Sequence, residues 1–170
     1  MSEEPRGWVE RVTEVPPNPV DVYRHSPVRL LGYANEVGEA FRALVHVNWV
    51  RLSYVIASTY VLADTLDKAR RVAQSSKTSP LALRRTRITH SAIDTLLWQS
   101  FASVLIPGFT INRLCALARL LLRARAKAHP WAHRWAPTAL GLAAIPFIVR
   151  PIDAAVDRAM DFGVRPFFRD

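Results

Sequence analysis

Residues 44–63 read LVHVNWVRLSYVIASTYVLA, an apolar stretch that contains a single formal charge, at Arg51. An α-helix rises about 1.5 Å per residue, so this stretch would extend over roughly 30 Å, the thickness of a bilayer hydrocarbon core. Residues 92–111 and 136–149 are two further apolar stretches. Each of the three contains polar residues or a proline, which favours helices buried both in a membrane and against one another.

Prolines shorten the second and third stretches. Pro107-Gly108 is expected to stop the second helix, leaving a helix of roughly 24 Å. Pro146 interrupts the third stretch, and Pro151 suits the first turn of a last helix that ends near Phe162. Both helices are short for a membrane span. A soluble domain that uses the same stretches as core helices is therefore the alternative.

The positive charge lies in the middle of the chain. The 170 residues carry a formal net charge of +9, and residues 68–134 hold 13 basic side chains against one acid, Asp94. A basic segment of this kind favours a polyanionic partner, either anionic lipid or nucleic acid. No zinc-finger or helix-turn-helix pattern accompanies these cations, so nucleic acid is disfavoured. The single cysteine, Cys115, excludes an internal disulfide framework.

The chain divides into a leader, one membrane domain and a short tail. Residues 1–27 are rich in proline and acids, so they predict a disordered leader, without the features of a secretory signal or a mitochondrial presequence. Residues 28–162 form a helical domain, in which 72–89 is a flexible basic linker, and 163–170 form the tail. No segment alternates with the period of a strand. We therefore predict an all-α fold, a small multi-helix integral membrane bundle with three to four hydrophobic helices and one basic amphipathic helix.

Polar side chains form a stripe on each of the first two apolar helices. The stripe on the second helix, which includes Thr95, would match the stripe on the first helix and pair with it. Such paired stripes fit either an intramembrane site or simple helix packing through polar residues. The candidate residues of this stripe are Asn48, Arg51, Ser58, Thr59, Gln99 and Ser103.

Residues 112–128 predict a basic amphipathic helix. Its apolar face carries Leu114, Leu117, Ala118, Leu121 and Leu122. The opposite face carries the three candidate contacts to anionic lipid, Arg119, Arg123 and Lys127. Such a helix can lie in a membrane interface with its cations on anionic head groups.

Signals for catalysis are weak. His129 and His133 have the spacing of a metal pair, but no acid or third ligand accompanies them, so a metal site is disfavoured. Asp153, Asp157 and Asp161 recur every four residues and would pair with Arg150 and Arg158 on one helix face. The chain has no phosphate-binding glycine loop and no nucleophile elbow. We expect neither an enzyme nor a cofactor.

Four blocks of sequence resemble the mitochondrial fission process protein family, also called the mitochondrial 18 kDa protein family. They are RLLGYANEVGEAFR at 29–42, SYVIASTYVLAD at 53–64, DTLLWQSFASVLIPGFTINR at 94–113 and TALGLAAIPFIVRPID at 138–153. The resemblance extends over residues 29–161. Its motif residues, which are candidates for packing or for a docking surface, are Gly32, Tyr33, Asn35, Glu36, Gly38, Glu39, Pro107, Gly108, Asn112, Arg113, Pro146, Pro151 and Asp153.

The resemblance implies a non-enzymatic, multi-pass protein of the mitochondrial inner membrane that promotes mitochondrial fission and maintains network shape. A membrane scaffold or adaptor is the expected role, and modulation of permeability through neighbouring carriers is the alternative. The expected partners are membrane lipids, with cardiolipin as the candidate, and other inner-membrane or fission-machinery proteins. The leader and the linker do not resemble those of the family.

The family's segment after FTINR is usually counted as a span, but here Arg119, Arg123 and Arg125 crowd it. We therefore expect a re-entrant hairpin through Pro107-Gly108, which would place the basic linker and the basic helix on one side of the membrane.

Overall fold

The computed structural model describes residues 23, 27–123 and 130–168, and every regular element in these ranges is a helix. A 3-10 helix, η2 (Pro27–Tyr33), leads into α2 (Ala34–Phe41), and α3 (Val47–Ser75) follows. Next come α4 (Leu81–Gln99), the π-helical segment η3 (Ser100–Leu105) and α5 (Ile106–Leu122). The chain ends with α6 (Pro130–Gly163) and the 3-10 helix η5 (Arg165–Phe168). The all-α class is confirmed.

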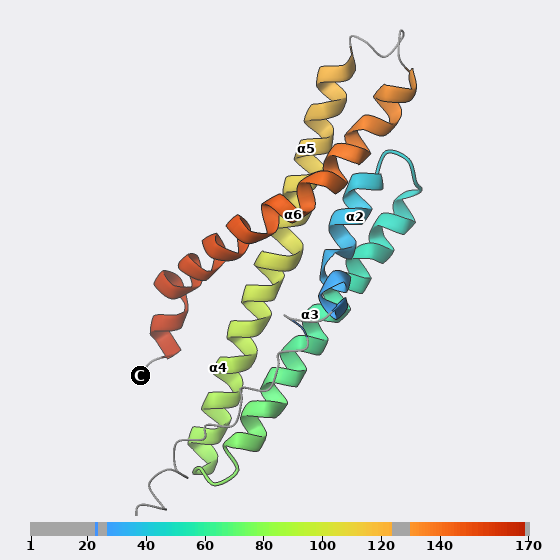
Figure 1. Ribbon diagram of the computed structural model, residues 1–170. Coiled ribbons are helices and arrows are strands. Elements are labelled where there is room, and N and C mark those ends of the chain that lie inside the picture. Colours follow the sequence, from blue (N-terminus) through green and yellow to red (C-terminus); the bar gives the residue numbers. More distant parts are fainter. Residues whose placement is uncertain (1–22, 24–26, 124–129, 169–170) are drawn as a thin grey trace, which may run out of the picture.

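Helices α3 and α4 form a long antiparallel hairpin (Figure 1). The expectation of a flexible linker over 72–89 is wrong, because α3 continues to Ser75 and α4 begins at Leu81. The Ser/Thr/Pro cluster breaks the helix only over 76–80, while the arginines that follow it are good helix formers. The Ser76 N–H donates to the Val72 carbonyl at 3.0 Å and closes α3.

The chain passes through Pro107 without a turn. Helix α4 continues through the wider π-helical segment η3 into α5, so the expected stop at Pro107-Gly108 and the re-entrant hairpin are both wrong. Proline lacks an N–H and its ring crowds the preceding turn. A π-helical turn relieves both problems within the helix, and Pro107 then stands in the first turn of α5, where its fixed φ is favourable. The basic amphipathic helix is accordingly the far end of a longer helix.

Helix α6 runs back from the end of α5, beside α5 and α2, and its C-terminal part crosses α4 at an angle (Figure 1), where Val156 and Met160 pack against Trp98. It contains Pro137, Pro146 and Pro151. The expected interruption at Pro146 and the separate last helix from Pro151 are therefore not found. Each proline removes only one backbone hydrogen bond, which a helix packed against neighbours tolerates. The predicted leader lies almost wholly outside the described residues.

Two helices in the described ranges are long and apolar enough to cross a membrane. They are Leu81–Leu122, of 42 residues, and Pro130–Gly163, of 34 residues. Helix α3, which holds the stretch at 44–63, is not one of them, so the expected three to four hydrophobic helices reduce to two candidate spans. Length suggested a span in α3, but Asn48, Arg51 and Asp64 lower its mean hydropathy.

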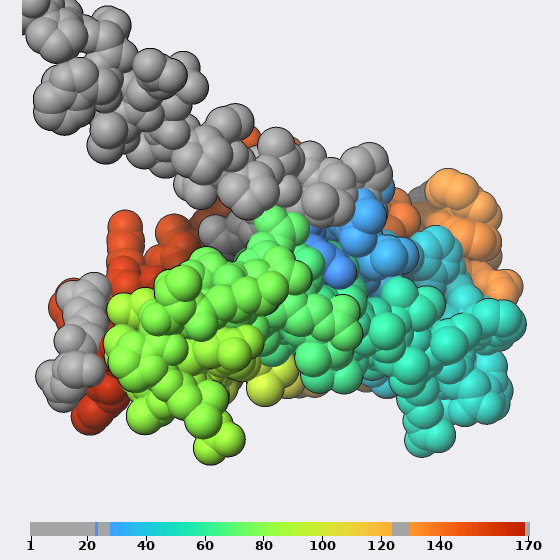
Figure 2. All heavy atoms as spheres, turned by 90° about the horizontal axis from the view of Figure 1, so that it is seen from below, coloured from blue at the N-terminus to red at the C-terminus, as the bar shows by residue number. Residues whose placement is uncertain are grey.

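The outer faces of the long helices carry many large apolar side chains. Only 11% of the apolar window in α6 is buried inside the protein, whereas a soluble core helix is mostly buried. Leucine, phenylalanine and tryptophan side chains are exposed on every long helix, with Trp49 at 65% and Phe147 at 79%. Figure 2 shows α3 and the start of α4 forming one face in teal and green, with the two ends of α6 at opposite edges. Large apolar side chains therefore cover much of the exterior, while the buried residues include both apolar side chains and carboxylates.

Candidate functional site

The motif helix α2 packs against α3, α5 and α6 and places Glu39 among them. The Glu39 carboxylate accepts hydrogen bonds from Arg42 at 2.6 Å (Nε) and 2.5 Å (Nη2). The Tyr54 hydroxyl from α3 donates to it at 2.9 Å, and the Asn112 amide from α5 donates at 2.7 Å. The Arg113 guanidinium donates to the Asn112 amide oxygen at 2.9 Å, which orients that amide. We call Glu39, Arg42, Tyr54 and Asn112 the polar hub.

Hydrogen bonding decides the charge state of the polar hub. Burial alone would raise the pKa of the Glu39 carboxyl, but the hydrogen bonds from Arg42, Asn112 and Tyr54 outweigh it and hold that pKa below its usual value. An ionised carboxylate accepts several strong, charge-assisted hydrogen bonds at once. The hub therefore fastens three helices through one buried charge.

Asn35 connects α2 to the π-helical segment. Its amide Nδ2 donates to the Val104 carbonyl at 2.9 Å. This approach requires Gly108, because a Cβ at that position would lie 2.9 Å from the Asn35 Nδ2 and 2.8 Å from the Tyr54 hydroxyl. The π-helical turn before Pro107 thus presents the Val104 carbonyl as an acceptor for Asn35 of α2. Such π-helical turns often occur at functional sites.

Two motif glycines on the N-terminal side allow α3 to approach closely. A Cβ on Gly38 would lie 2.8 Å from the Cβ of Ser53, and a Cβ on Gly32 would lie 3.0 Å from the Tyr60 ring. Small residues at such crossings let helices pack backbone to backbone. Gly32 and Gly38 therefore serve packing, while a docking role for the other motif residues stays a prediction.

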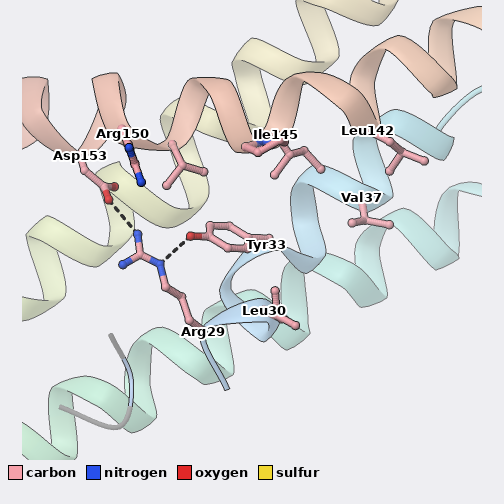
Figure 3. A pocket seen from close by; sticks show the side chains of 10 residues that line it. Arg29, Leu30, Tyr33, Val37, Leu142, Ile145, Arg150 and Asp153 are labelled. Carbon is pink, nitrogen blue, oxygen red and sulfur yellow. Dashed lines mark hydrogen bonds and ion pairs between the residues drawn. The ribbon is translucent and has the colours of Figure 1, made fainter. Parts of the chain in front are cut away.

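Arg29 ties η2 to α6. Its Nη2 donates to the Asp153 carboxylate at 2.8 Å, and its Nε donates to the Tyr33 hydroxyl at 2.5 Å (Figure 3). Glu36 is completely buried, and neither of its carboxylate oxygens has a hydrogen-bond partner in the described part of the chain. Burial, reinforced by the charge of Asp153, raises the pKa of Glu36 to about 8.

A second polar cluster joins α3 to α4. Asp64 is completely buried and accepts hydrogen bonds from the Gln99 amide at 2.5 Å and from Lys68 at 2.9 Å. Ser103 donates to the Gln99 amide oxygen at 2.6 Å. Gln99 and Ser103 are thus brought together, as expected, but their partner from α3 is Asp64.

The expected pairing of the two stripes is wrong. Asn48, Arg51 and Thr59 are exposed on the outer side of α3, and Ser58 is exposed beside a pocket that it shares with Leu96 and Ser100. The buried face of α3 follows the heptad spacing Val50, Ala57 and Asp64, with Tyr60 and Val61 between them. At about 100° per residue, the expected stripe lies away from this face. Thr95 and Gln99 on α4 are buried.

Only part of the expected lipid-binding face falls within the described residues. Arg123 is exposed and Arg119 is half-buried, while Lys127 lies outside the described residues. Helix α5 packs against the protein through Ile111, Cys115 and Ala118, while Leu117 is 52% and Leu121 is 70% exposed, as a face turned to lipid would be. Contact of these cations with anionic lipid stays a prediction.

The three aspartates of α6 have other partners than Arg150 and Arg158. Asp153 binds Arg29, while Arg165 binds Asp157 at 3.3 Å and Asp161 at 2.8 Å. Arg165 also binds Asp94 of α4 at 2.8 Å, so the expected tail is anchored. His129 lies outside the described residues, and the described ranges contain no cluster of three or more His, Cys, Asp or Glu fit for a metal.

Sequence reasoning missed Tyr54 as a partner of the hub, and Asp64 and Arg165 as helix-connecting residues. The heptad spacing of Val50, Ala57 and Asp64 could have shown that Asp64 faces inward. Tyr54 and Arg165 carry no such signal, because their partners lie far away in the sequence.

Comparison with known proteins agrees with the motif blocks. The family model for the mitochondrial 18 kDa protein matches residues 21–160. Mitochondrial fission process protein 1 of Caenorhabditis elegans is 50% identical over 151 residues, which are 88% of this chain and 90% of that protein. The proteins of the same name are 47% identical over 89% of this chain and 91% of theirs in Danio rerio, and 49% identical over 87% and 88% in Homo sapiens. No solved structure matches. With the motif helix at the centre of its fold, this chain belongs to the mitochondrial fission process protein family.

Proposed function

We propose that this chain promotes mitochondrial fission as a non-enzymatic, multi-pass scaffold of the mitochondrial inner membrane. Its near-full-length similarity to proteins named for mitochondrial fission supports the process. The single observation that carries the scaffold role is that buried carboxylates join the helices while large apolar side chains cover their outer faces. Buried Glu39 and Asp64 fasten the helices to one another, while the exposed apolar side chains of α5 and α6 face outward.

This distribution suits a rigid membrane bundle better than a reaction centre. Helices in lipid associate through close packing and polar contacts, because lipid tails supply no hydrophobic force between them. Both polar clusters connect helices, and each of their buried carboxylates is engaged by donors from a neighbouring helix. The fixed shape would present the outer surface of α3 and α6 to lipids and to partner proteins of the division machinery.

Modulation of membrane permeability is the alternative at the same location. Its candidate residue was Arg51, which is exposed on α3 away from the face that carries Asp64. This position favours the scaffold. Arg51→Leu is therefore expected to leave the proton leak of respiring mitochondria unchanged, whereas a changed leak would support the permeability role.

Imaging of the mitochondrial network tests the proposal. Cells that lack the chain should contain elongated, interconnected mitochondria, and the wild-type chain should restore the normal network. Glu39→Ala, which breaks the polar hub, should restore it less well at matched expression. Gly163→Ala serves as the control, because a Cβ there would meet nothing within 4 Å. An unchanged network in cells without the chain would contradict a role in fission.

A further inference from the structure

A pocket of about 690 Å³ lies between η2, α2 and α6, and its two ends differ in chemistry. One end holds Arg29, Arg150 and Asp153, while Val37 and Leu142 lie at the other (Figure 3). Leu30, Ile145 and Val149 add to the apolar wall. The pocket is therefore amphipathic along its length.

Among the described lining residues, the charged end carries one positive charge in excess. Arg29 is paired with Asp153 at 2.8 Å, whereas Arg150 is exposed and forms no hydrogen bond or ion pair in the described part of the chain. An unpaired guanidinium binds phosphate oxygens well, because its donors form a planar fork.

The order of these residues along α6 matches the profile of a membrane. Residues 136–149 are apolar, and Arg150 and Asp153 follow directly after them. If α6 crosses the bilayer, the arginines lie near the head groups and the apolar wall extends from there into the hydrocarbon. From Leu142 to Asp153 the helix rises roughly 16 Å, enough to lie along much of an acyl chain.

We propose that this pocket binds one anionic phospholipid, with its phosphate on Arg150 beside Arg29 and an acyl chain along Leu142 and Ile145. This inference rests on the proposed membrane insertion of α6, but on no role in fission. The pocket is separate from the cations of α5. The excess positive charge at one end and the apolar wall beyond it favour an anionic lipid.

Lipid retention by the purified full-length chain tests the site. Native mass spectrometry in detergent would compare phosphatidylglycerol with phosphatidylcholine of the same acyl chains. A head-group contact of about 1 kcal/mol corresponds to roughly a fivefold preference. Arg150→Gln should remove this preference, and Arg150→Lys should retain part of it. Arg158→Gln is the matched control, because it removes an exposed arginine two turns further along α6, outside the pocket.

A photo-cross-linking residue at position 142 identifies the occupant in membranes. A cross-link to phospholipid is expected. A cross-link to the chain's own residues 1–22, or to another protein, would overturn the proposal, as would equal effects of Arg150→Gln and Arg158→Gln. Alkaline extraction of the same variants separates the two inferences. Absence of the phosphatidylglycerol preference in a wild-type chain that stays in the membrane defeats the lipid site alone, whereas release of the wild-type chain from the membrane defeats both.

Discussion

At the scale of residues, buried carboxylates organise this protein, and their surroundings divide them into two kinds. Glu39 is surrounded by donors from two helices besides its own neighbour Arg42. Glu36, one turn earlier on α2, is equally buried but accepts no hydrogen bond in the described residues. A buried charge is stable only where donors satisfy it. Glu39 therefore stabilises the packing of the helices, whereas the burial of Glu36 destabilises the folded state.

Removal of the Glu39 carboxylate should destabilise the fold strongly. Glu39→Ala leaves the Tyr54 hydroxyl and the Asn112 amide without their acceptor, which costs about 3 kcal/mol. For a chain of this size that is a fall in Tm of roughly 6–12 °C. Thermal unfolding in detergent measures it. Asp67→Ala, which removes a half-exposed pair with Arg71, should cost less than about 1 kcal/mol. Equal effects of the two variants would contradict the hub.

Gly38 should tolerate no side chain unless Ser53 gives way. Gly38→Ala places a methyl group against the Ser53 side chain, so the variant should lose about 1–3 kcal/mol through overpacking. Ser53→Gly in the same chain should recover part of this loss, and thermal unfolding of the single and double variants measures the coupling. Gly163→Ala should be nearly neutral. The absence of coupling between positions 38 and 53 would refute the close approach.

Glu36 should make stability depend on pH. Its pKa rises from 4.5 to about 8 on folding, so between these values the folded state binds more protons than the unfolded state. The free energy of unfolding therefore falls as the pH rises from about 4.5 to 8, and changes little above that. Glu36→Gln removes this contribution, so its Tm should match the wild type at pH 5 and exceed it at pH 8. Parallel curves for the two proteins across this range would count against the buried, unpartnered carboxyl.

At the scale of elements, the decisive feature is the uninterrupted passage from α4 through η3 into α5. The sequence could supply the helical class and the turn after Ser75, because periodicity and turn residues are local signals. The sequence could not show whether the helix continues through Pro107, since a proline can stop a helix, kink it or follow a π-helical turn. Asn35 on α2 completes that turn by binding the Val104 carbonyl, a contact across 69 residues of sequence.

The continuous helix predicts opposite locations for its two ends. Residues 81–122 extend over about 60 Å, more than a bilayer core, so the residues flanking them should emerge on opposite sides. Lys77→Cys and Arg123→Cys, each in a Cys115→Ser background, can be labelled with an impermeant maleimide in mitoplasts. One position should react in intact mitoplasts and the other only after detergent is added. Labelling of both positions from one side would restore the re-entrant hairpin.

At the scale of the whole molecule, polar groups hold the inside together and apolar groups cover the outside. Of the motif residues, Asn112 binds Glu39, and Gly108 lies against Asn35 and Tyr54. These contacts could not be predicted, because helical periodicity gives the direction of a side chain on its own helix but not the residue that it contacts. The same limit explains why the expected pairing of the stripe at Asn48 and Arg51 with α4 is not found, while Asp64 makes that contact.

The apolar exterior and the buried carboxylates suit the proposed integral protein of the mitochondrial inner membrane. Alkaline carbonate extraction of mitochondria that carry the tagged full-length chain tests this proposal most directly, with protease protection in intact organelles and mitoplasts. The account predicts that the chain stays in the membrane pellet and is protected until the outer membrane is opened. Release of the chain into the carbonate supernatant would contradict it and would favour a soluble helical module.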